Sequence, residues 1–135
     1  MKGRQTASRV LTGLAWIAGI LFPFYSLRRF SADYGATFDW MFHTHASHVL
    51  MHAFLYTVMA WLLASFVPCR LWKRQALAIA SVLAGILTIA ISQEVIQMTC
   101  ERVSLGTDEV FDIVVDLTGG LLGTMMYCKA RWHCR

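Results

Sequence analysis

The residues of this chain that could do chemistry are histidines, carboxylic acids and an amide, and their spacing repeats with the period of a helix. His48 and His52 are four residues apart, and Glu94 and Gln97 are three apart. Three aspartates recur at every fourth position: Asp108, Asp112 and Asp116. Side chains three or four residues apart share one face of an α-helix. We therefore expect three polar stripes, one on each of three helices.

These stripes suit the binding of a polar headgroup or sugar. Carboxylates, an amide and a guanidinium together can bind phosphate, hydroxyl and amine groups. The predicted ligand-binding residues are His52, Glu94, Gln97, Arg102, Asp112 and Asp116. In this prediction Arg102 neutralises a phosphate or carboxylate, and the acids orient sugar or amine groups. A purely structural network is the alternative, in which Glu94 pairs with Arg102 and Asp116 bonds to His52 or Gln97.

The histidines also raise the question of a metal ion. His48 and His52 have the i, i+4 spacing that can hold one metal, with Glu94 or Asp112 as an oxygen ligand. The pair lacks the intervening glutamate of the zinc-protease motif His-Glu-x-x-His. Histidine pairs of this kind more often form hydrogen bonds. We therefore predict no metal and no cofactor, with His48 and His52 as the candidate ligands if a metal does bind.

Four apolar stretches must position these side chains. The chain is 57% hydrophobic and 15% charged, whereas soluble domains hold about 25% charged residues. Each stretch approaches the roughly 20 residues that a helix needs to cross a hydrocarbon core of about 30 Å. We predict an all-α fold, a four-helix transmembrane bundle forming a single domain over residues 1–135. The helices are expected at about residues 10–27, 47–67, 75–98 and 109–128, and the first is expected to be retained rather than cleaved as a signal peptide.

The charges are divided between the two ends of these helices. If the chain crosses four times, nine of the twelve basic residues fall on one side: Lys2, Arg4, Arg9, Arg70, Lys73, Arg74, Lys129, Arg131 and Arg135. None of the eight acids falls there. This is the positive-inside pattern, so we predict a multi-pass protein of the cytoplasmic (inner) membrane with both termini in the cytoplasm. Because topology explains the basic excess, and no basic-aromatic interleaving is present, no nucleic acid partner is predicted.

Small residues mark one helix as a packing element. Gly119 and Gly123 form a G-x-x-x-G pair in the last apolar stretch, where glycines let another helix approach closely. We favour packing within the chain, against segment 75–98 or the first segment, over dimerisation. The oligomeric state is left open.

The ordered polar residues resemble the signature of VanZ-like membrane proteins. That family has a Glu-x-x-Gln pair, an Arg in the following loop, and an Asp-x-x-x-Asn-x-x-Gly-x-x-x-Gly helix. Here the corresponding residues are Glu94, Gln97, Arg102, Asp112, Asp116, Gly119 and Gly123, and His52 and Tyr56 match the family's His followed by an aromatic. The resemblance covers about residues 47–124. The chain departs from the pattern with Asp116 in place of Asn, with Ser47 and His48 in place of Asp-Lys, and with a longer loop after Arg102.

The resemblance implies a small integral membrane protein of the cell envelope, and no settled biochemical activity attaches to the family. Its founding member is associated with low-level resistance to teicoplanin, a glycopeptide. We therefore expect a membrane-lipid partner, with an envelope lipid or a glycopeptide-related ligand in an outward-facing polar pocket. One alternative is a membrane-embedded hydrolase or transferase in which His52 or Asp112 is the general base. Another is a small assembly partner that docks a second membrane protein on the Gly119 and Gly123 face. Whether the chain is an enzyme is left undecided.

Overall fold

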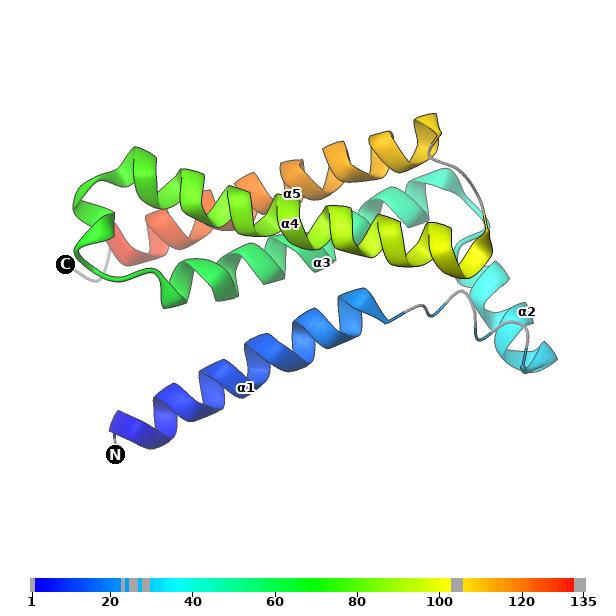
Figure 1. Ribbon diagram of the computed structural model, residues 1–135, viewed down its shortest axis with the longest axis horizontal. Coiled ribbons are helices and arrows are strands. Elements are labelled where there is room, and N and C mark those ends of the chain that lie inside the picture. The colour runs from blue at the N-terminus through cyan, green and yellow to red at the C-terminus, as the bar shows by residue number, and fades with distance from the viewer. Residues whose placement is uncertain (1, 23, 25–26, 28–29, 103–105, 133–135) are drawn as a thin grey trace.

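The chain is built from helices, and the described residues contain no strand. The computed structural model describes residues 2–22, 24, 27, 30–102 and 106–132 (Figure 1). Its elements in order are α1 (Lys2–Leu21), α2 (Ala32–Met41), α3 (His45–Phe66), the 3-10 turn η2 (Leu71–Lys73), α4 (Gln75–Glu101) and α5 (Thr107–Trp132). The all-helical class predicted from the sequence is confirmed.

Three of the helices are long and apolar enough to cross a membrane. They comprise 22 residues of α3, 26 residues of α4 and 25 residues of α5. At about 1.5 Å per residue each is longer than a hydrocarbon core of about 30 Å. These helices identify the chain as a membrane protein.

Close packing of α5 against α3 rests on two glycines. A Cβ at Gly119 would lie 2.5 Å from the Ala53 carbonyl oxygen, and one at Gly123 would overlap the carbonyl oxygen of Thr57. The Thr57 hydroxyl donates a hydrogen bond of 3.1 Å to the Gly119 carbonyl, which ties the two backbones together. The sequence analysis expected these glycines to face segment 75–98 or the first segment. They pack on α3 instead, because α3 and α5 are direct neighbours, and it is Gly120 that faces α4.

The first helix is not among the three long apolar spans. Helix α1 comprises Lys2–Leu21, and within the described side chains its apolar stretch is Ala7–Leu21, shorter than each of those spans. The predicted span 10–27 therefore extends beyond the end of α1, and Pro23 lies outside the described residues. One attachment of α1 is the indole of Trp16, which donates a hydrogen bond of 3.1 Å to the Leu55 carbonyl of α3. The structure is a three-helix core with α1 alongside it (Figure 1).

A short helix, α2, lies between the first two predicted helices, in a segment for which the sequence analysis predicted no helix. Ser31 caps it by accepting a hydrogen bond of 3.2 Å from the Tyr34 amide, as serine commonly does at helix N-termini. Thr44 then caps α3 by accepting a hydrogen bond from the amide of Ser47. Helix α2 lies at one end of the core, beside the beginning of α3 (Figure 1).

The basic segments gather at the opposite end. The start of α1, the η2 turn and the end of α5 all lie at that end (Figure 1). They carry the described basic residues Arg9, Arg70, Lys73, Arg74, Lys129 and Arg131. The predicted polar stripes lie at the α2 end. The fold thus separates these basic residues from the candidate site along the length of the core, whereas Arg102 lies at the α2 end.

Candidate functional site

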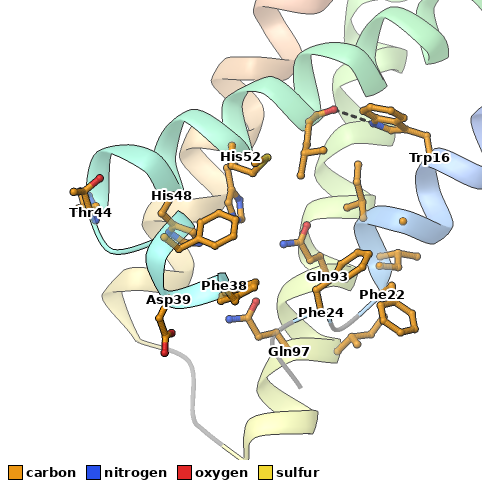
Figure 2. A pocket seen from close by; sticks show the side chains of 18 of the residues that line it. Trp16, Phe22, Phe24, Phe38, Asp39, Thr44, His48, His52, Gln93 and Gln97 are labelled. Carbon is orange, nitrogen blue, oxygen red and sulfur yellow. Dashed lines mark hydrogen bonds between the residues drawn. The ribbon is translucent and has the colours of Figure 1, made fainter. Parts of the chain in front are cut away.

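A cavity of about 820 Å³ opens between α1, α2, α3 and α4 (Figure 2). Its apolar wall includes Trp16, Ile20, Phe22, Phe24, Phe38 and Leu55. Its polar wall includes Thr44, His45, His48, His52, Gln93 and Gln97. The volume falls in the range of about 300–1,000 Å³ that is typical of small-molecule sites. The cavity is amphipathic, with aromatic and aliphatic side chains meeting a group of histidines and amides.

His52 is held in place by Asp116 of α5. The His52 Nδ1 atom and Asp116 Oδ1 are 2.9 Å apart. When Asp116 is ionised its carboxylate only accepts hydrogen bonds, so in that state Nδ1 donates and Nε2 is left as an acceptor. Asp116 is fully buried, and its second oxygen has no hydrogen-bond partner among the described residues. Of the partners that the sequence offered for Asp116, the structure selects His52 rather than Gln97.

His48 has its own carboxylate, one helical turn earlier on α5. Its Nδ1 lies 3.8 Å from Asp112 Oδ1, and the side chains are 39% and 13% exposed. The rings of His48 and His52 stand edge to face with centroids 4.5 Å apart. One ligand atom from each of His48, His52 and Asp112 lies within 4.8 Å of the other two. The i, i+4 histidine pair therefore meets an i, i+4 aspartate pair across the α3–α5 contact.

On α4 the structure separates two residues that the sequence placed on one face. Gln97 lines the cavity, whereas Glu94 is only 2% exposed and does not line it. Neither carboxylate oxygen of Glu94 has a hydrogen-bond partner in the described part of the chain. His52, Asp112 and Asp116 are near enough to Glu94 to interact with it electrostatically.

Gln93 is a site residue that the sequence analysis missed. It lines the cavity one turn before Gln97, and Figure 2 shows both amides extending from α4 toward the histidines of α3. Its Oε1 accepts a hydrogen bond of 2.9 Å from the hydroxyl of Tyr56. The i, i+4 spacing of Gln93 and Gln97 in the sequence could have indicated that they share one face of the helix.

Arg102 lies apart from these residues. Helix α4 continues to Glu101, three residues beyond the end expected at 98, and Arg102 forms its C-cap in a left-handed conformation with φ of 58°. Its amide donates to the carbonyl of Met98, its side chain is exposed, and it does not line the cavity. The structure thus brings His48, His52, Asp112 and Asp116 together, places Gln97 in the same cavity wall and Glu94 in the core nearby, and leaves Arg102 outside.

Comparison with known proteins identified no relative of this chain. No family model, no curated protein and no solved structure matches the chain. The resemblance to VanZ-like proteins therefore stays an expectation from the sequence.

Proposed function

We propose that this membrane protein binds the polar headgroup and adjoining chain of an envelope lipid in the cavity between α1, α2, α3 and α4. The observation that carries the proposal is the amphipathic lining of a cavity about 820 Å³ in volume. A lipid has the same division between polar and apolar parts. The headgroup lies against His48, His52, Gln93 and Gln97, and the chain lies against the aromatic wall formed in part by Trp16.

The polar wall favours headgroups that carry hydroxyl or amine groups. The described residues of its lining include no lysine or arginine. Arg102, proposed from the sequence to neutralise a phosphate, is exposed outside it. The glutamine amides both donate and accept hydrogen bonds. Asp112 and Asp116 act from behind the histidines, by orienting the imidazole rings rather than by reaching the ligand.

In the proposed topology the cavity faces outward from the cytoplasmic membrane. The basic segments at the other end of the core would then face the cytoplasm with both termini, as the positive-inside pattern favours. In this orientation the cavity meets the outer leaflet. If the VanZ resemblance holds, the same pocket is the place to look for an effect on teicoplanin susceptibility.

The proposal is tested by lipid retention in the purified protein. Wild-type protein, Gln97→Leu and Gln75→Leu are extracted from the same membranes, and the lipids retained by each chain are counted by native mass spectrometry. Gln75 is the matched control because it is exposed at the other end of α4. A lost hydrogen bond of about 1.4 kcal/mol predicts roughly tenfold less lipid on Gln97→Leu. Equal retention by all three proteins would contradict the proposal.

A second candidate, hydrolysis or group transfer on an envelope lipid, is favoured by the hydrogen bond between His52 and Asp116. A carboxylate that fixes the tautomer of a histidine leaves Nε2 free to act as a general base. Turnover of radiolabelled phospholipid vesicles that is lost in His52→Ala and retained in His43→Ala, at an exposed histidine outside the cavity lining, would support this function. No turnover by the wild-type protein would contradict it.

The third alternative from the sequence, docking of a partner on Gly119 and Gly123, has less to support it. Both glycines are buried against α3. A partner would need a different surface.

A further inference from the structure

We infer that His48, His52 and Asp112 form a binding site for a divalent metal ion of the zinc class. One ligand atom from each lies within 4.8 Å of the others, and His48 Nδ1 is 3.8 Å from Asp112 Oδ1. A tetrahedral zinc ion with bonds of about 2.1 Å holds its ligand atoms about 3.4 Å apart. Side-chain rotations that close the triad by about an ångström complete the site.

Asp116 supplies the support that a metal-binding histidine normally has. Histidine ligands generally donate the ring N–H that does not face the metal to a carboxylate or carbonyl, which fixes the tautomer and the ring direction. His52 Nδ1 donates to Asp116 Oδ1 at 2.9 Å, so Nε2 is the nitrogen left for a metal. The sequence favoured a simple hydrogen-bonded histidine pair. The structure instead places a separate carboxylate beside each histidine, Asp112 beside His48 and Asp116 beside His52.

Positive charge near His48, His52 and Asp112 would stabilise the buried acids around them. Glu94 is 2% exposed with neither oxygen hydrogen-bonded, and Asp116 Oδ2 is also without a partner in the described part of the chain. Both lie in membrane-spanning helices, where a charged group costs about 2.5–3.5 kcal/mol even on the lenient insertion scales. Among the described residues, no lysine or arginine lines the adjoining cavity. A divalent cation at the triad offsets the negative charge of these carboxylates.

The donor set selects the kind of metal. Two imidazoles and one carboxylate suit zinc and neighbouring transition metals, whereas magnesium and calcium prefer oxygen ligands. Three protein ligands leave a fourth position open, as in catalytic zinc sites. His48 and His52 both line the cavity, so this open position faces it (Figure 2).

This inference does not rest on the proposed lipid function, because the metal is measured without any added lipid ligand. The full chain, carrying an affinity tag without histidine, is purified in detergent and stripped with a chelator. It is then dialysed against Zn²⁺ or Mg²⁺, and metal per chain is determined by elemental analysis. The visible spectrum of the Co²⁺-loaded protein reports on nitrogen and oxygen coordination.

We expect one zinc ion per wild-type chain and no stoichiometric magnesium. His48→Ala, His52→Ala and Asp112→Asn each lower zinc affinity about a hundredfold or more, and Asp116→Asn, which perturbs only the supporting hydrogen bond, lowers it about 10–100-fold. His43→Ala and Asp108→Asn are the controls, because both residues are exposed and lie outside the metal cluster and the cavity lining, and they keep wild-type affinity.

Two results would overturn the inference. One is a folded wild-type protein that binds no zinc at a stoichiometric level. The other is zinc binding that is unchanged in His48→Ala and Asp112→Asn. Helix content by circular dichroism separates loss of the site from loss of the fold, and His48 is the safest position to change because its side chain is 39% exposed.

Discussion

At the scale of single residues, the polar side chains of α4 fall into two groups. Gln93 and Gln97 line the cavity, whereas Glu94 is buried in the core. The helical period puts Glu94 and Gln97 about 60° apart around the helix, near enough for the sequence to predict one shared face. The boundary between cavity and core falls between them, and it is set by where α1, α3 and α5 lie. The period of one helix carries no information about that placement.

The pair formed by His52 and Asp116 is expected to stabilise the fold. Replacing His52 with alanine removes the imidazole that pairs with Asp116, whose side chain is fully buried. Removing one member of a buried ion pair typically costs about 3–5 kcal/mol. Asp116→Asn is expected to cost less, since its amide oxygen still accepts the bond from His52. The free energy of unfolding in detergent, measured for both variants, checks this.

The exposed His43 is the control for the His52 substitution. His43→Ala is expected to leave the free energy of unfolding within about 0.5 kcal/mol of wild type. If His52→Ala were as mild as His43→Ala, the buried pair would not have the structural role assigned to it.

At the scale of elements, the sequence predicted that α5 makes a close helix contact through small residues. The G-x-x-x-G pattern at Gly119 and Gly123 indicated a close helix contact, but it did not identify α3 as the partner. Helix α2 was missed because its ten residues include no buried side chain and therefore show no clear apolar stripe. Its boundaries depend on capping by Ser31, which the sequence analysis did not consider.

The glycine contact predicts opposite effects for two alanine substitutions. Gly123→Ala drives a Cβ into the Thr57 carbonyl, and overpacking of this kind costs about 1–3 kcal/mol. Gly19→Ala meets nothing within 4 Å, so only the helix propensity changes and stability rises by about 0.5–1 kcal/mol. Thermal unfolding in one detergent compares them. A destabilisation of the same size in both variants would argue against the α3–α5 contact described above.

The indole of Trp16 is expected to hold α1 against α3. Trp16→Phe removes the hydrogen bond to the Leu55 carbonyl and should cost about 0.5–1.5 kcal/mol. The loss should appear as faster amide hydrogen exchange in α1 with little change in α5. Trp40→Phe, at a side chain that is 75% exposed on α2, is the control. Unchanged exchange in α1 of the Trp16 variant would show that this bond does not anchor the helix.

At the scale of the whole molecule, the sequence predicted the class and the separation of charges, but not the role of the first helix. Long apolar runs identify α3, α4 and α5 because their hydropathy alone meets the length of a membrane span. Helix α1 was predicted as the fourth member of the bundle, but it is not among the helices long and apolar enough to span a membrane within the described residues. The position of α1 relative to α3 and α4 is set by tertiary packing, which the sequence pattern does not reveal. The cavity lies between these helices and α2, so it could not be predicted either.

The proposed topology predicts which cysteines are reached from outside the cell. Cys69 lies near the basic η2 turn, and Cys100 lies near the other end of α4. Single-cysteine variants are made by replacing the remaining cysteines with serine. A membrane-impermeant maleimide should label Cys100 in intact cells and Cys69 only after permeabilisation. The reverse result would invert the topology and turn the cavity toward the cytoplasm.

The most direct test of the central claim is a high-resolution structure of the protein in a native lipid membrane. The account predicts elongated density in the cavity, running from the aromatic wall near Trp16 to the polar group formed by His48, His52 and Gln97. A cavity closed by α1 packing onto α3, or a cavity holding only water, would contradict the claim that this protein binds a lipid there.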